Sequence, residues 1–117
     1  MNGSSRGILH VEDDPYIQTY LNALLSDIAD ISHVTTIKAA RELLARRDFD
    51  LMIIDFTLPD GSGSELVAEL ARNNSTLPII VFSSHEISDT IINVDRVFVK
   101  GRYKEQDLID TVRGICS

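Results

Sequence analysis

The chain is poor in cysteine, in basic residues and in long apolar runs, and each shortage excludes a class of protein. Cys116 is the one cysteine, so no internal disulfide can form and no cysteine-based metal-ligand spacing exists. There are 11 basic residues against 18 acidic ones, a net charge of −7, which disfavours direct binding to nucleic acid or to an anionic membrane. No apolar run approaches the roughly 18 residues of a membrane-spanning helix, and no signal peptide is visible. We therefore expect a cytoplasmic protein that does not bind membranes.

The length of 117 residues suits one compact domain and is too short for two. A hydrophobic content of 44% is ordinary for a globular chain and permits a core of its own. The first six residues, MNGSSR, are small and polar. We expect a single domain over residues 1–117, in which residues 1–6 form a flexible tail.

Short apolar runs alternate along the chain with segments of helical periodicity. The expected strands are residues 7–12, 31–36, 51–54, 78–82 and 96–99. One expected helix begins near residue 15. Three others are expected over residues 37–47, 62–72 and about 104–116. The run LMII at 51–54 does not alternate in polarity, which is typical of a central parallel strand covered on both faces. Strands that alternate with helices predict a doubly wound α/β fold with a parallel sheet.

Two of the expected helices carry a start signal. Asp14 precedes Pro15, which is typical of a capping residue followed by proline at the first helical position. Ser62 and Glu65 have the spacing of a capping box. Asp14 is therefore assigned to the helix cap rather than to a site.

Ionisable and hydroxyl residues stand where four of the five expected strands end. They are Glu12, Asp13 and Asp14 after the first strand, Asp55 after the third, Ser83 and Ser84 after the fourth, and Lys100 after the fifth. Ligands of open α/β sheets bind beyond the carboxyl ends of the strands. We expect these groups to converge in one crevice, with Asp55 at its floor.

The chemistry of such a cluster follows from its charges. Three carboxylates held together repel one another unless a cation lies between them, and Mg²⁺ is a hard cation that takes carboxylates, waters and phosphate oxygens. Glu12, Asp13 and Asp55 would be balanced by Lys100 and Mg²⁺, which leaves a nearly neutral pocket able to receive a phosphoryl group. A carboxylate can be the nucleophile in phosphoryl transfer, and a lysine, a metal and a hydroxyl can stabilise the phosphoryl oxygens. The residues therefore predict a phosphoryl-transfer site.

Four motifs in order, HVEDDP, IIDFTLPDGSG, IIVFSS and VFVKG, resemble the receiver domain of bacterial two-component response regulators of the chemotaxis type. The resemblance covers about residues 7–116. It implies a flavodoxin-like fold, with a five-stranded parallel sheet in the order 2-1-3-4-5. It also implies a signalling phosphoprotein that takes a phosphoryl group from a histidine kinase or phosphotransfer protein and changes conformation. Self-phosphorylation and autodephosphorylation apart, such a protein is not an enzyme.

The resemblance assigns a phosphoacceptor and the ligands of Mg²⁺. Asp55 matches the phosphoacceptor, which forms the aspartyl phosphate and also contacts the metal. Asp13 matches the acid that binds the metal directly, and Glu12 matches the acid that binds it largely through water. The backbone carbonyl of Thr57 matches the remaining protein ligand.

Two further residues match positions that bind the phosphoryl group in this family. Ser83 matches the hydroxyl residue that binds the group and signals its presence, and Lys100 matches the lysine that pairs with the phosphoryl oxygens. Thr57 and His85 fall at two variable positions that tune the lifetime of the phosphoryl group. The resemblance therefore gives His85 a modulating role.

The chain departs from the family pattern mainly on the face used for output. Gly101 follows the lysine where a proline is usual, and Val97 stands where a tyrosine or phenylalanine acts as a rotameric switch. Phe98 is adjacent but should point to the opposite face of the strand, and Ser84 replaces a small alanine. The segment before the fifth strand is short, so the fourth helix must be short or irregular. We expect a domain that takes phosphate but couples it to partners in an atypical way.

Two other functions stay open beside the phosphoacceptor. A phosphatase of the haloacid dehalogenase type needs a second aspartate two residues after the nucleophile, where this chain has Thr57. A pseudo-receiver that is never phosphorylated, acting purely as an interaction module, would fit Val97 and Gly101. Membership of a larger hybrid kinase or multidomain regulator, and a homodimer, also stay open.

Three residues with reactive side chains have simpler interpretations. His10 lies within an apolar run and is expected to be a hydrogen-bonded core histidine. His33 is expected at the surface, and Cys116 is expected to pack in the last helix.

Overall fold

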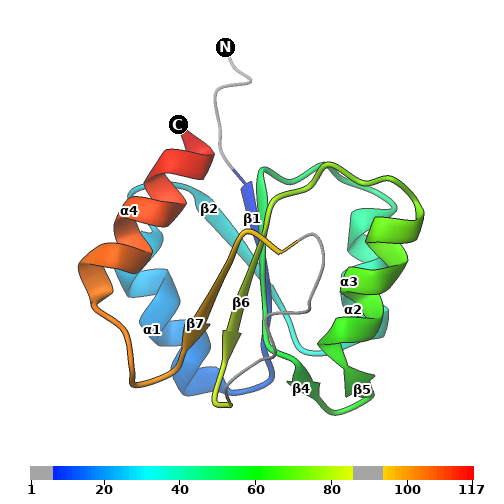
Figure 1. Cartoon of the computed structure of the whole chain (residues 1–117), viewed down its shortest axis with the longest axis horizontal. Helices are drawn as coiled ribbons and strands as arrows, with labels where there is room; N and C mark the ends of the chain where they lie inside the picture. Colours follow the sequence, from blue (N-terminus) through cyan, green and yellow to red (C-terminus); the bar gives the residue numbers. More distant parts are fainter. Residues whose placement is uncertain (1–6, 86–93) are drawn as a thin grey trace.

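A five-stranded parallel sheet forms the centre of the molecule, in a computed structural model that describes residues 7–85 and 94–117 (Figure 1). The strands lie in the order β2-β1-β3-β6-β7, which is 2-1-3-4-5 when the five sheet strands are numbered along the chain. Their bounds are β1 (Gly7–Val11), β2 (Asp30–Val34), β3 (Leu51–Ile54), β6 (Ile79–Ser83) and β7 (Arg96–Val99). Every neighbouring pair is parallel, so the predicted fold class and strand order are confirmed.

Helices cover both faces of the sheet (Figure 1). One pair lies against one face and the other pair against the opposite face: α1 (Pro15–Leu25) with α4 (Glu105–Cys116), and α2 (Ile37–Leu44) with α3 (Gly63–Arg72). The predicted short or irregular fourth helix falls within residues 86–93, outside the described part of the chain. None of the helices within the described ranges has both the length and the apolarity that crossing a bilayer requires.

The central strand β3 explains why the core has two halves. All four of its residues are buried, and because side chains alternate along a strand, they divide between the two faces. Leu51 and Ile53 join the cluster beneath α1 and α4, whereas Met52 and Ile54 join the cluster beneath α2 and α3. The non-alternating run LMII is thus a strand covered on both sides, as predicted.

The predicted helix starts are confirmed. Asp14 accepts a hydrogen bond from the Tyr16 N–H at 2.9 Å, with Pro15 at the first helical position. Ser62 and Glu65 form a reciprocal capping box at the start of α3. These caps end the loops that leave β1 and β3, and so fix how those loops cross the carboxyl end of the sheet.

A small hairpin between β3 and α3 was not predicted. Its strands β4 (Thr57–Leu58) and β5 (Gly61–Ser62) pair antiparallel, and Leu58 is buried. Gly61 has a φ of 144°, a conformation that side chains rarely adopt. Strands of two residues are too short to show periodicity, which is why sequence patterns do not detect them.

Candidate functional site

A cleft of about 450 Å³ opens at the carboxyl end of the sheet. It gathers residues from the ends of four strands, as the sequence predicts: Glu12, Asp13, Asp14, Pro15, Asp55, Thr57, Ser84, His85 and Lys100 line it. Glu12, Asp13 and Asp55 can each direct one carboxylate oxygen to a common point, with the three oxygens within 4.8 Å of one another. Oxygen donors of this kind suit a hard divalent cation.

Lys100 connects the two buried acids of the cleft. Its Nζ donates to Glu12 Oε1 at 2.7 Å and to Asp55 Oδ2 at 2.8 Å. Glu12 is 1% exposed and Asp55 6%, so both charges are removed from water and need this partner. One lysine does not balance three acids, so the cleft keeps a surplus of negative charge that a cation can neutralise.

The pKa values of the pair follow from burial and from this bridge. Burial raises the pKa of Glu12, and this outweighs the hydrogen bonds from Lys100 and from the Asp14 N–H that favour its charged form. Burial alone would lower the pKa of Lys100, but its hydrogen bonds to Asp55 and Glu12 outweigh burial and raise it. The lysine is therefore held in its charged form.

Backbone groups fix the position of Asp55. The Asp55 N–H donates to the Val11 carbonyl at 3.0 Å, and the Thr57 N–H donates to Asp55 Oδ1 at 3.0 Å. A Cβ at Gly63 would lie 2.4 Å from the Asp55 carbonyl oxygen, so only glycine allows α3 to approach this closely. Both carboxylate oxygens of Asp55 thus have a defined partner, one a backbone amide and the other Lys100.

Ser83 and Val97 do not line the cleft, unlike the other predicted site residues. Ser83 is 1% exposed, and its Oγ accepts a weak hydrogen bond of 3.4 Å from the His85 N–H. Its backbone carbonyl accepts from the Lys100 N–H at 2.8 Å, so it lies beside the lysine in the sheet. Val97 is 37% exposed, and the neighbouring Phe98 is buried on the opposite face, as predicted.

Aromatic side chains under the lysine were not predicted as part of the site. Lys100 Nζ lies 5.7 Å from the centre of the Phe82 ring, and Phe82 contacts Tyr103 edge to face. The Tyr103 hydroxyl is 2.7 Å from that of Tyr20, which donates to Glu105 at 2.6 Å. Because side chains alternate along a strand, Phe82 is expected on the face of the sheet opposite Ser83. No local sequence pattern indicates that its ring lies close to Lys100.

A pair of histidines lies on the neighbouring strands β1 and β2. His10 is buried as predicted, and its Nδ1 is 2.9 Å from Nδ1 of His33. His33 is partly exposed at the edge strand β2. In-register pairing of β1 with β2 places the two residues opposite each other. Burial, with smaller contributions from His33 and Lys100, lowers the pKa of His10 to about 3.

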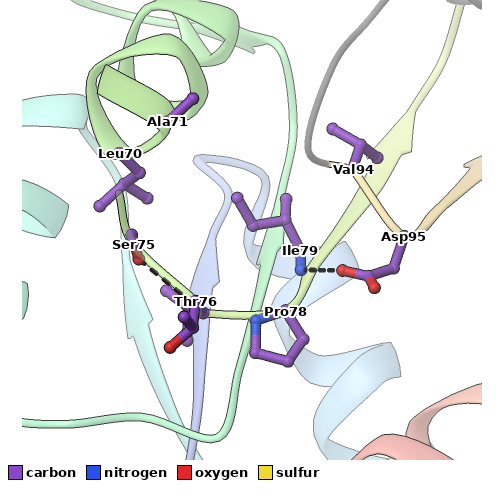
Figure 2. Close-up of a pocket in the computed structure, with 9 residues that line it drawn as sticks. Leu70, Ala71, Ser75, Thr76, Pro78, Ile79, Val94 and Asp95 are labelled. Atoms are coloured by element: carbon purple, nitrogen blue, oxygen red, sulfur yellow. Dashed lines mark hydrogen bonds between the residues drawn. The ribbon is translucent and has the colours of Figure 1, made fainter. Parts of the chain in front are cut away.

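A second cavity, of about 280 Å³, lies at the opposite end of the sheet (Figure 2). Its lining includes Leu70, Ala71 and Pro78, and its one acid, Asp95, already accepts from the Ile79 N–H at 2.8 Å. Among the described residues it brings together no cluster of charged groups.

Fold and cleft together define a flavodoxin-like α/β domain, with acids and a lysine at the carboxyl end of a parallel sheet. The chain belongs to the response regulator receiver domain family, whose sequence model matches residues 8–102.

Relatives and a solved structure agree with this assignment. The chain is 37% identical over 90 residues to the response regulator protein PilR of Pseudomonas aeruginosa, covering 76% of this chain and 20% of PilR. It is 38% identical over 90 residues to the KDP operon transcriptional regulatory protein KdpE of Escherichia coli, covering 75% of this chain and 40% of KdpE. The matched segment thus spans only 20% of PilR and 40% of KdpE. The response regulator protein TrrA from Thermotoga maritima, solved in complex with Mg²⁺ and beryllium fluoride, shares the fold with a TM-score of 0.82 at 23% identity, covering 94% of this chain and 98% of TrrA.

Proposed function

We propose that this chain is a phosphoacceptor in a two-component system or phosphorelay. Asp55 takes a phosphoryl group from a phosphohistidine of a histidine kinase or phosphotransfer protein, and the domain then changes conformation. The observation that carries the proposal is the convergence of Glu12, Asp13 and Asp55 around one point, with Lys100 bridging the two buried acids. A structural cluster of charges would not need an exposed third acid such as Asp13 at an open cleft.

Mg²⁺ is the cofactor that fits this donor set. Glu12, Asp13, Asp55 and the carbonyl of Thr57 would hold it, because all four supply hard oxygen atoms. When bound, it supplies positive charge for the phosphoryl oxygens. The presence of Mg²⁺ in the related TrrA complex supports this choice of cation.

The protein's own groups account for the transfer step. A carboxylate oxygen of Asp55 attacks phosphorus, the bond from phosphorus to the donor imidazole nitrogen breaks, and that nitrogen keeps the electron pair. Lys100 can exchange its contact with Asp55 Oδ2 for a contact with a phosphoryl oxygen, because its ammonium has three donors. Ser83 Oγ accepts from the His85 N–H, which leaves its hydroxyl proton as a donor. Because Ser83 is buried outside the cleft lining, donation to the phosphoryl group requires a local movement at the end of β6.

We assign modulating roles to His85, Ser84 and Val97. His85 and Ser84 line the cleft, where they can affect the access of water and so the lifetime of the phosphoryl group. Val97 has no aromatic ring that could change rotamer on phosphorylation, which supports an atypical output face. The same feature favours the second candidate, a pseudo-receiver that only binds partners.

The wider setting is part of the proposal. The chain acts as one domain over residues 1–117 in the cytoplasm; the tail predicted for residues 1–6 lies outside the described residues. It serves a hybrid kinase or multidomain regulator, since PilR and KdpE are much longer than this chain. A homodimer is compatible with this arrangement, whereas direct binding to nucleic acid is disfavoured by the net charge of −7. Apart from its own phosphorylation and dephosphorylation, it is not an enzyme.

Intact-mass measurement with acetyl phosphate tests the function. Wild type should gain one phosphoryl mass only when Mg²⁺ is present, and Asp55→Asn should gain none. Asp48→Asn, an exposed acid outside the cleft, is the matched control and should behave like wild type. Absence of both an adduct and Mg²⁺ binding in wild type would favour the pseudo-receiver.

A further inference from the structure

The turn between β4 and β5 is tied to a helix from another part of the chain. Asp60, in this turn, accepts hydrogen bonds from the Ile37 N–H at 2.9 Å and the Lys38 N–H at 3.1 Å. These amides belong to the first turn of α2, where an acidic group is favoured by the exposed N–H groups. The bond to the Ile37 N–H, followed by the bond to the Lys38 N–H, lowers the pKa of Asp60, so the carboxylate stays charged.

The hairpin that carries Asp60 also carries one edge of the cleft. Thr57 begins β4, lines the cleft and pairs with Ser62, while Leu58 pairs with Gly61. The Thr57 N–H in turn donates to Asp55 Oδ1. Movement of the hairpin would therefore shift both Thr57 and the amide that orients Asp55.

Helix α2 has an ordinary cap without Asp60. Thr36 is its N-cap residue, and Thr36 Oγ1 accepts from the Ala39 N–H at 3.0 Å. Asp60 is thus a second acceptor at this helix end, and it comes from the turn between β4 and β5. The core holds both partners, because Ile37 and Ala40 of the helix and Leu58 of the hairpin are buried in the same cluster. The two bonds of Asp60 therefore add a polar connection between the hairpin turn and the helix end.

We propose that Asp60 is a positioning residue, which anchors the β4–β5 hairpin to α2 and so sets the affinity of the cleft for Mg²⁺ through Thr57. This inference rests on the proposed function. The competing explanation is that Asp60 only stabilises α2, in which case its loss would lower stability and leave the cleft unchanged.

Two substitutions at the same helix end separate these explanations. Asp60→Ala removes the acceptor that belongs to the hairpin, and Thr36→Ala removes the acceptor that belongs to the helix. Mg²⁺ is titrated calorimetrically into each full-length variant, at a temperature where circular dichroism shows it to be folded. Asp60→Ala should weaken Mg²⁺ binding about 10-fold, as the loss of a group that orients a metal ligand does. Thr36→Ala should stay within about two-fold of wild type, and Asp60→Asn, which keeps one acceptor oxygen, should fall between them.

The rate of phosphorylation by acetyl phosphate gives a second readout. At saturating Mg²⁺ the Asp60→Ala rate should return to near the wild-type value, because Asp55, Ser83 and Lys100 are unchanged. At low Mg²⁺ the rate should fall in proportion to the lost affinity. A purely structural role would not produce this difference between the two concentrations.

Amide hydrogen exchange measured without metal completes the test. The Gly63 N–H, bonded to the Phe56 carbonyl, and the Thr57 N–H should exchange faster in Asp60→Ala than in Thr36→Ala. Equal effects of Asp60→Ala and Thr36→Ala on Mg²⁺ affinity, or no effect of Asp60→Ala, would overturn the inference. If wild type bound no Mg²⁺, both the proposed function and the inferred effect of Asp60 on Mg²⁺ affinity would be wrong. The hydrogen-exchange rates would still decide whether Asp60 anchors the hairpin.

Discussion

Lys100 Nζ lies 2.8 Å from Asp55 Oδ2 and, through its second bond to Glu12, holds two buried carboxylates at once. Lys100→Met would leave both acids without a cationic partner. Without metal, the variant should lose about 2 kcal/mol of unfolding free energy at neutral pH. This is less than breaking a fully buried ion pair costs, because Lys100 is partly exposed to water. Urea unfolding measures the loss, and added Mg²⁺ should restore part of it, because the ion binds only the folded state.

Lys104→Met is the control for the change of charge. Lys104 is exposed, and its side chain makes no cap hydrogen bond at the start of α4. Its replacement should alter the unfolding free energy by less than about 0.5 kcal/mol. Equal stability of the two variants would show that the bridge to Asp55 and Glu12 contributes nothing.

The burial of His10 predicts a loss of stability in mild acid. Its pKa is lowered to about 3 in the folded protein, against 6.5 for the free side chain. Its contribution is therefore fully present above pH 6.5 and is lost as the pH falls toward 3. Between pH 7 and pH 5 this should remove about 2 kcal/mol from the unfolding free energy. His10→Leu should remove that part of the slope, which urea unfolding at the two pH values measures.

His85→Gln controls for the loss of any histidine. His85 is exposed at the cleft, so its replacement removes a histidine without changing the buried His10. A His10→Leu protein that keeps the wild-type slope would mean that other groups cause the acid sensitivity.

Local signals predicted most of the fold, and the parallel sheet accounts for much of the site. Asp14 with Pro15, and Ser62 with Glu65, mark helix starts by short-range bonding that the sequence displays directly. Because the carboxyl ends of parallel strands meet, residues after different strands converge without any local contact between them.

What the sequence did not predict depends on contacts between distant segments. The bonds of Asp60 to α2 join residues more than 20 positions apart, and no local pattern marks them. The contact between His10 and His33 depends on the register in which β1 pairs with β2. Such features require the register and packing of the whole domain.

Gly63→Ala should disturb the site through its backbone. The new Cβ would lie 2.4 Å from the Asp55 carbonyl oxygen and 3.0 Å from Ile54 Cγ1, so backbone must shift. We expect a loss of about 1–3 kcal/mol in unfolding free energy, together with weaker Mg²⁺ binding by calorimetry. Gly114→Ala is the matched control, because a Cβ there meets nothing within 4 Å and alanine favours the helix. That variant should be as stable as wild type or more stable, and a similar loss at both positions would contradict the steric explanation.

Glu12 provides a prediction with the opposite dependence on pH from that of His10. Burial raises the pKa of Glu12 above its ordinary value of 4.5, so the folded state favours the protonated acid. The contribution of Glu12 to stability is therefore fully present below pH 4.5 and is lost as the pH rises through the higher folded pKa. In metal-free buffer, Glu12→Gln should thus gain stability relative to wild type between pH 4 and pH 7, as measured by urea unfolding. Glu42→Gln, at an exposed position of α2, should show no such gain. Mg²⁺ at pH 7 should stabilise wild type more than Glu12→Gln, because the ion requires the ionised carboxylate that the variant lacks.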